Sequence, residues 1–214
     1  MEREHATRAG LGLIGKHTLV IHPGEGSWLL LGEVLTTLEV EPDRPIDRPD
    51  PCGSCTRCID ACPTGAIEPF KVDGSRCLAY TTIEHREAVD PDLYEATGDW
   101  LFGCDICQEV CPHNQPTRGK RGLEVLEAYD QRRDGFDLLE VLGWREEDRR
   151  EAFITSALKR AKLPMFKRNA VICAGNALQK RADPALKDRL VEIAEDPEED
   201  PIVAETARTV LKSL

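Results

Sequence analysis

The sequence lacks any long hydrophobic run. None of its apolar stretches approaches the roughly 20 residues that a membrane-spanning helix needs. The opening residues, Met1 to His5, also lack the basic and then apolar pattern of a secretory signal. With 214 residues, the chain can bury a core without disulfide staples. We therefore expect a soluble protein of the reducing cytoplasm that makes no contact with a membrane.

Negative charge is missing from one long stretch of an otherwise acidic chain. The net charge at pH 7 is −11, which argues against non-specific coating of nucleic acid. Residues 152–182 nevertheless contain no acid. This stretch is either a solvated helix face or a surface that binds phosphates. Its basic residues are Lys159, Arg160, Lys162, Lys167, Arg168, Lys180 and Arg181.

Cysteine, in contrast, is plentiful and regularly spaced. A first run, Cys52-x2-Cys55-x2-Cys58-x3-Cys62-Pro63, has the spacing by which proteins hold a [4Fe-4S] cluster. A second run, Cys104-x2-Cys107-x3-Cys111-Pro112, lacks the leading cysteine, and Cys77 between the runs can supply that thiolate. Structural zinc and a disulfide framework are the alternatives, but neither explains a triple that ends in Cys-Pro. The spacing therefore predicts two [4Fe-4S] clusters.

The two runs are expected to exchange their fourth ligands. In paired runs of this type the fourth cysteine ligates the other cluster. Each Cys-Pro step is also expected to begin a helix, because proline is tolerated at the first helical position. The ninth cysteine, Cys173, lies in an apolar helical stretch and is expected to be a small buried side chain. We assign Cys52, Cys55, Cys58 and Cys111 to cluster I, and Cys62, Cys77, Cys104 and Cys107 to cluster II.

The chain divides into three expected segments of an α+β protein. Residues 1–47 predict a short helix and two strands, 17–22 and 28–40, joined by the turn 23–26, as in a fragment of a larger α/β domain. Residues 48–118 predict a two-cluster ferredoxin-type domain of short helices and loops. Residues 119–214 predict helix pairs that resemble HEAT-type repeats. Two of these helices should begin at Asp183-Pro184 and Asp200-Pro201.

Several short motifs of the sequence closely resemble those of epoxyqueuosine reductase, and the resemblance covers nearly the whole chain. The Cys-Pro motifs alone would suit any two-cluster ferredoxin, whereas the motifs around them are more specific to this family. They are Ala9-Gly-Leu-Gly-Leu-Ile-Gly-Lys-His17, Leu31-Gly-Glu-Val34, Cys62-Pro-Thr-Gly-Ala-Ile67, Arg76-Cys77, Tyr80-x-Thr82-Ile-Glu84, Gly103-Cys104-Asp-x-Cys107-Gln, Arg168-Asn169-Ala170 and Gly175-Asn176.

This resemblance implies a cobalamin-dependent oxidoreductase that converts epoxyqueuosine to queuosine at the wobble position of tRNA. It implies that cluster I faces an external low-potential electron donor and cluster II faces the corrin of cobalamin, in a monomeric enzyme. The cobalamin contacts would come from two short stretches, and the anticodon stem-loop would lie on the basic helical stretch. The implied cobalamin contacts are Gly15, Lys16, His17, Thr18, Leu78, Ala79 and Tyr80, and the implied RNA contacts are Lys159, Arg160, Arg168 and Asn169.

One departure from the family concerns the beginning of the chain. In the family, most of the cobalamin-binding domain and the proposed proton donor precede the motif that starts at Ala9, whereas here Met1 stands eight residues before it. We therefore expect the carboxy-terminal portion of such an enzyme and assign no catalytic residue. Two other functions are kept as alternatives: an electron-transfer module without catalysis, and another corrinoid reductase such as a reductive dehalogenase. The basic helical stretch argues against the former, and the missing twin-arginine signal argues against the latter.

Overall fold

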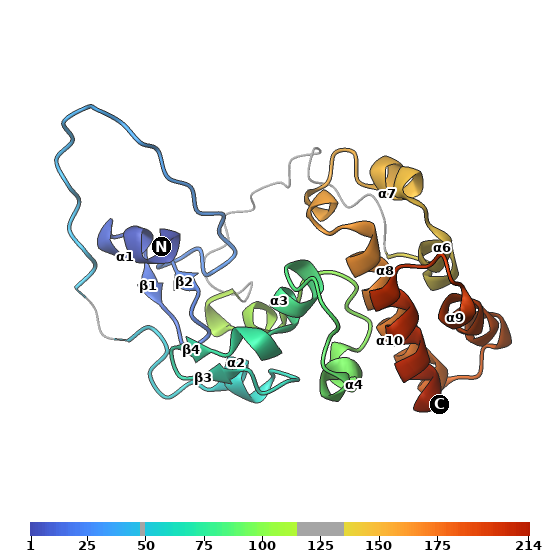
Figure 1. Cartoon of the computed structure of the whole chain (residues 1–214). Helices are drawn as coiled ribbons and strands as arrows, with labels where there is room; N and C mark the ends of the chain where they lie inside the picture. Colours follow the sequence, from blue (N-terminus) through green and yellow to red (C-terminus); the bar gives the residue numbers. More distant parts are fainter. Residues whose placement is uncertain (48–49, 115–134) are drawn as a thin grey trace. The chain divides into compact units, whose positions relative to one another are not determined.

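The computed structural model describes residues 1–47, 50–114 and 135–214 (Figure 1). Its contacts divide the chain into two compact units, Met1–Gly74 with Asp105–Val125, and Ser75–Cys104 with Leu126–Leu214. We call them the first and the second unit. The units interleave along the sequence, so they differ from the three segments expected from it. The expected boundaries near residues 48 and 118 lie outside the described residues.

Two short antiparallel hairpins belong to the first unit. Leu13 lies opposite Ile21 in the first hairpin, and Ile67 lies opposite Val72 in the second. Residues 22 and 26 pair with each other, which confirms the turn expected over residues 23–26. The strands are β1 (Leu13–Ile14), β2 (Val20–Ile21), β3 (Ile67–Glu68) and β4 (Lys71–Val72).

The prediction of a strand over residues 28–40 was wrong. These residues form no strand, and Leu30, Val34 and Leu35 are exposed. The strand expected over residues 17–22 is likewise reduced to β2. A run of β-forming residues becomes a strand only where a neighbour completes its hydrogen-bond ladder. The described residues supply no such neighbour to residues 28–40.

The helices of the first unit are short. The helix expected at the start of the chain is confirmed, and it packs on β1 and β2 through the buried Ala6. The two helices that carry cluster cysteines pack against each other. The helices are α1 (Glu2–Arg8), α2 (Arg57–Asp60) and α5 (Ile106–Glu109), with a 3-10 turn at Pro112–Asn114 and another, Gly74–Arg76, where the units meet in sequence.

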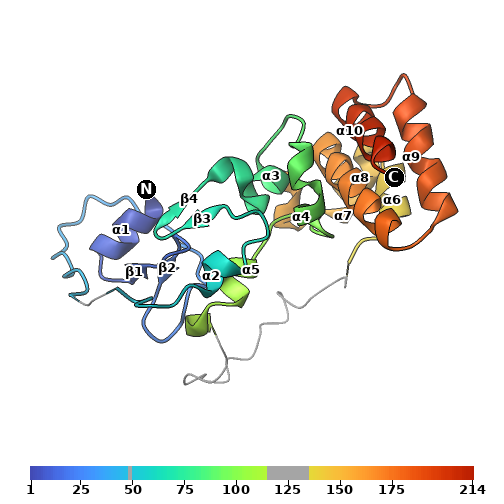
Figure 2. The same ribbon diagram turned by 90° about the horizontal axis from the view of Figure 1, so that it is seen from below.

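The second unit is helical, and its three longest helices lie side by side in Figures 1 and 2. The expected starts of two of them are confirmed. The Asp183 carboxylate accepts a hydrogen bond from the Leu186 N–H, and the Asp200 carboxylate accepts one from the Ile202 N–H. The helices are α3 (Leu78–Ile83), α4 (Tyr94–Thr97), α6 (Leu138–Gly143), α7 (Glu146–Ala152), α8 (Leu163–Lys180), α9 (Pro184–Glu195) and α10 (Pro201–Lys212), with 3-10 turns at Pro91–Leu93 and Ala157–Arg160.

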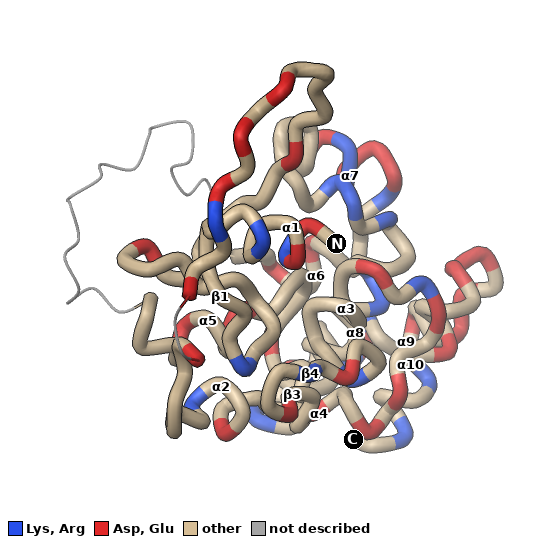
Figure 3. The backbone as a smooth tube through the Cα atoms, turned by 90° about the vertical axis from the view of Figure 1, so that its left-hand side faces the viewer, with Lys and Arg blue, Asp and Glu red and all other residues tan. Residues whose placement is uncertain are grey.

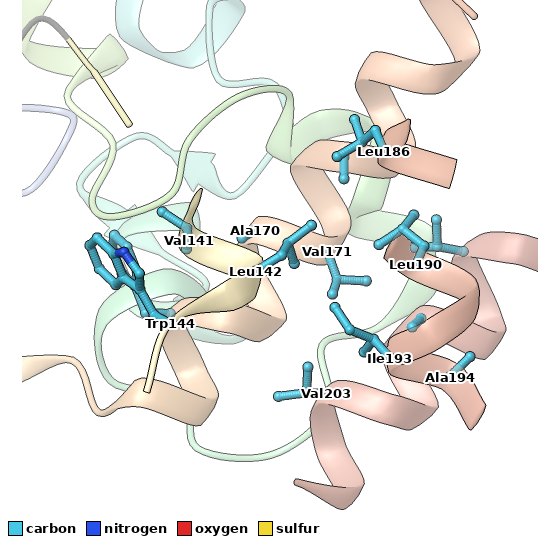
Figure 4. Close-up of a cluster of buried hydrophobic side chains, with 14 of the residues drawn as sticks. Val141, Leu142, Trp144, Ala170, Val171, Leu186, Leu190, Ile193, Ala194 and Val203 are labelled. Carbon is cyan, nitrogen blue, oxygen red and sulfur yellow. The ribbon is translucent and has the colours of Figure 1, made fainter. Parts of the chain in front are cut away.

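The core of the second unit forms where α6, α8, α9 and α10 meet (Figure 4). Leu186, Leu190 and Ile193, spaced three and four residues apart, are all buried, and this spacing is typical of the buried face of a helix. A Cβ added at Gly175 would lie 2.5 Å from a methyl carbon of Val210. The glycine therefore lets α10 approach α8 closely. The helix α7 ends with its C-cap Phe153, which is buried in this core, whereas the next residue, Ile154, is exposed.

In residues 1–47, 50–114 and 135–214, no helix is both long enough and apolar enough to cross a bilayer.

Candidate iron-sulfur centres

Four cysteines of the first unit lie close enough to one another for their charges to interact. Burial raises the pKa of the Cys52, Cys58 and Cys111 thiols, and nearby thiolates raise it further: Cys111 acts on Cys52, and Cys55 acts on both Cys58 and Cys111. Thiolates gathered in this way need a positive partner, because burial and mutual repulsion oppose their ionisation. The ligand set assigned to cluster I is thus brought together within one unit.

Backbone N–H groups point at the sulfur atoms of this unit. The Lys16 N–H donates to Cys52 Sγ at 3.3 Å, and the Ala66 N–H donates to Cys62 Sγ at 3.3 Å. Backbone N–H groups of His113 and Asn114 lower the pKa of Cys111, although burial outweighs them. Hydrogen bonds to ligating sulfur stabilise the anionic thiolate and tune the potential of a cluster. These donors fit an iron-sulfur cluster.

Lys16 holds the loop that carries the first two cysteines. Its ammonium Nζ donates to the Gly53 carbonyl at 2.6 Å and to the Cys55 carbonyl at 3.0 Å. Since C=O and N–H point in opposite directions across a trans peptide, fixing these carbonyls also fixes the N–H groups that follow them. The family resemblance implies that Lys16 contacts cobalamin, and in the structure both its backbone N–H and its side chain bind the cysteine loop.

Asn114 is a positioning residue that the sequence does not reveal. Its side chain accepts from the Ser27 N–H at 2.7 Å and donates to Ser27 Oγ at 2.9 Å and to the Gln108 carbonyl at 2.8 Å. A Cβ added at Gly26 would lie 2.1 Å from Asn114 Oδ1. The turn before Ser27 is therefore packed tightly on the loop that follows Cys111.

The helices expected after the two Cys-Pro steps are corrected by the structure. Cys62 is followed by a turn, in which the Gly65 N–H donates to the Cys62 carbonyl at 3.1 Å. Cys111 is followed by a single 3-10 turn. Proline permits a helix start but does not supply the residues that continue the helix. Cys62 and Cys107 nevertheless lie in the same unit, with Cys107 on α5.

The remaining two cysteines of the assigned cluster II belong to the second unit. Cys77 stands directly before α3, and Cys104 ends the segment that begins there. The Gly103 N–H donates to Thr82 Oγ1 at 2.9 Å, so the residue before Cys104 is joined to α3, the helix that follows Cys77. All nine cysteines lie in the described ranges, and none forms a disulfide. Cys173 is buried as expected, and its burial raises the pKa of the thiol to about 12.

The predicted cobalamin contacts fit such a group only in part. His17 and Leu78 are buried at 3% and 2% exposure, and Gly15 is also buried, so protein atoms cover these three residues in the structure. His17 Nδ1 accepts from the Leu19 N–H, which leaves Nε2 buried without a partner. Tyr80 is exposed, and Ala79 is partly exposed.

The predicted RNA contacts divide into two pairs. Lys159 and Arg160 are exposed, and Arg160 forms an ion pair with Glu84 at 2.6 Å. Arg168 and Asn169 are buried at 0% and 1% exposure, and their side chains bind backbone carbonyls within the protein. The adjacent helix α7 carries charges of both signs (Figure 3). The basic stretch therefore offers phosphates no continuous surface along α8.

Comparison with known proteins shows which proteins this chain resembles. Residues 51–114 match the 4Fe-4S double cluster binding domain. The chain is 42% identical over 171 residues to the epoxyqueuosine reductase of Synechocystis sp., covering 79% of this chain and 58% of that protein. It is 43% identical over 173 residues to that of Cyclobacterium marinum, covering 79% of this chain and 53% of that protein.

A solved structure agrees with the sequence comparison. A crystal structure of epoxyqueuosine reductase with an epoxyqueuosine-modified stem loop of tRNA-Tyr superposes with a TM-score of 0.79 and 29% identity. It covers 99% of this chain and 54% of its own. The chain thus spans about half the length of the relatives it matches. By sequence and by structure, this chain, which corresponds to about half the length of each protein it matches, is a member of the epoxyqueuosine reductase family.

Proposed function

We propose that this chain forms the electron-transferring part of a reductase that converts epoxyqueuosine to queuosine in tRNA. The observation that carries the proposal is the gathering of Cys52, Cys55, Cys58 and Cys111, with N–H donors on their sulfur atoms, in a chain related to epoxyqueuosine reductases. The relatives are named for the whole reaction, and the chain spans about half of their length.

The reaction explains why two clusters would be needed. Conversion of an epoxide to an alkene takes up two electrons and two protons and releases the oxygen as water. A [4Fe-4S] cluster passes electrons singly, so a pair of clusters can relay them one after the other from an external low-potential donor. Cluster I would receive the electrons, and cluster II, on Cys62, Cys77, Cys104 and Cys107, would pass them on.

Cobalamin is the proposed acceptor of these electrons within the protein. When bound, it would supply a low-valent cobalt that is a strong nucleophile. Ala79 and Tyr80 retain accessible surface for such a group, and they directly follow the Cys77 ligand. In the turn at residues 15–18, Thr18 is held with a φ of 67° while Arg3 donates to its carbonyl at 2.5 Å. The chain's own share is therefore to hold and orient the cofactor at these two stretches.

Lys159 and Arg160 are proposed to bind the tRNA backbone. Both are exposed in the 3-10 turn that precedes α8, and no acid occurs between residues 152 and 182. A relative has been crystallised with a tRNA stem loop. Phosphate contacts of this kind would position the RNA without reading its sequence. We also propose a monomeric, cytoplasmic protein in which α8, α9 and α10 form a HEAT-type arrangement.

Iron content tests the two clusters. After anaerobic reconstitution, the parent protein should carry about eight irons per chain, since each cluster holds four. Cys77→Ala should lose about half of this iron, because cluster II would lose a ligand. Cys173→Ala is the matched control, since it also removes a thiol from the second unit, and it should keep the full content. A parent protein with about four irons would overturn the two-cluster assignment.

A further inference from the structure

Arg168 is a buried cation whose side chain uses every donor it has. An arginine side chain offers five N–H donors. Nη1 donates to the carbonyls of His85 and Glu87, Nη2 to the Thr81 carbonyl at 2.6 Å, and both Nη2 and Nε to Asn169 Oδ1. Among the residues that the structure describes, no carboxylate pairs with it. Burial accordingly lowers the pKa of Arg168 to about 10.

Asn169 completes the same hydrogen-bond network. Its Oδ1 accepts both bonds from Arg168, and its Nδ2 donates to the Thr82 carbonyl at 2.9 Å and to the Leu101 carbonyl at 2.8 Å. All the side-chain donors of the pair are thus satisfied within the protein. A fully satisfied buried network imposes one local geometry, because each lost bond would leave a buried polar group without a partner.

The carbonyls that this pair binds belong to the segment between two assigned cluster ligands. Thr81 and Thr82 lie in α3, which begins directly after Cys77, and Leu101 lies three residues before Cys104. Asn169 therefore holds both ends of the segment at once. The bond from the Gly103 N–H to Thr82 Oγ1 joins the same two ends.

We propose that Arg168 and Asn169 are positioning residues for cluster II, because they fix Cys77 and Cys104 relative to each other before the cluster binds. This inference rests on the proposed two-cluster function. It gives both residues a role in the protein interior, in place of a contact with RNA. The thiolates that bind one cluster must be held together in a set geometry, so preorganisation of two ligands on one rigid segment favours cluster binding.

The test compares two asparagines of α8. Asn176 is also buried, and its Nδ2 donates to two carbonyls of the same segment, Tyr94 at 2.7 Å and Gly98 at 2.9 Å. These carbonyls lie in the middle of the segment rather than at its ends. After anaerobic reconstitution, Asn169→Ala should lose about half of its iron and the electron paramagnetic resonance signal of one cluster. Asn176→Ala should lower the thermal midpoint similarly and keep both clusters.

A second pair of variants covers the case in which Asn169→Ala does not fold. Thr82→Val removes the acceptor of the Gly103 N–H, and Thr81→Val removes a hydroxyl that donates to the Leu78 carbonyl of its own helix. Thr82→Val should weaken cluster II, and Thr81→Val should not. Full iron with unchanged spectra in Asn169→Ala, or in Thr82→Val where the former does not fold, would overturn the inference. A parent protein without two clusters would instead overturn the proposed function.

Discussion

Lys16 in the first unit and Arg168 in the second unit both donate to backbone carbonyls and, in the described residues, to no carboxylate. Lys16 is partly exposed and binds two carbonyls of the short loop between Cys52 and Cys55. Arg168 is fully buried and, with Asn169, binds a segment that runs from Cys77 to Cys104.

The difference between the two follows from their side-chain chemistry. Lysine presents a compact charge that stays hydrated, which suits a partly exposed loop of a few residues. Arginine presents a planar fork of five donors, which can join several carbonyls and tolerates burial better. The guanidinium of Arg168 can therefore hold the long segment between two ligands, whereas the single ammonium of Lys16 is enough for the tight Cys52–Cys55 turn.

The largest expected effect is a difference in stability between variants of Arg168 and variants of Lys16. Arg168→Met should lower the free energy of unfolding by about 3–5 kcal/mol, because it leaves several buried polar groups without partners. Lys16→Gln should cost about 1 kcal/mol, since water can replace the lost bonds at a partly exposed site. Anaerobic thermal unfolding measures both, with Arg168→Lys as the conservative control. Equal losses in the two variants would remove the contrast.

A second prediction concerns two exposed cations, Lys159 and Arg160. Lys159→Glu combined with Arg160→Glu should weaken binding of a tRNA stem loop by about tenfold, or 1.4 kcal/mol. The salt dependence should become shallower, because fewer phosphates are neutralised. Lys180→Glu with Arg181→Glu is the matched control, since it makes the same change of charge at the carboxy-terminal end of α8, a helix about 27 Å long. Equal weakening by both pairs would indicate a general charge effect.

The smallest expected effect distinguishes the clusters electrochemically. Lys16→Gln removes a positive charge beside the cluster I loop, so the electron-rich reduced state should become less favourable. One of the two midpoint potentials should therefore fall, by up to about 59 mV for a tenfold change. Lys71→Gln, an exposed lysine that pairs with Glu68 in the same unit, should move neither potential. A shift of both potentials would contradict the assignment of Lys16 to one cluster.

Local patterns predicted those features that depend on neighbouring residues. The Asp-Pro starts of α9 and α10 and the cysteine runs were visible in the sequence, because caps and ligand spacing are short-range. The strand expected over residues 28–40 failed for the opposite reason. A strand depends on a distant partner for its hydrogen bonds, and sequence alternation does not supply one.

The role of Arg168 was missed because residue type reports charge and not exposure. A run of basic residues without acids is expected on a surface, since a buried charge normally requires an ionic partner. Here backbone carbonyls replace that partner, and they come from residues more than 80 positions earlier in the chain. Only the folded structure brings these groups together.

The network around Arg168 also bears on the order in which the protein is made. All eight assigned ligand cysteines leave the ribosome before Arg168 and Asn169 are synthesised. The segment from Cys77 to Cys104 therefore cannot adopt its fixed geometry until α8 has been translated and folded. Insertion of the second cluster would then be the later step of maturation, and ribosome-stalled chains that end before α8 would acquire the first cluster alone.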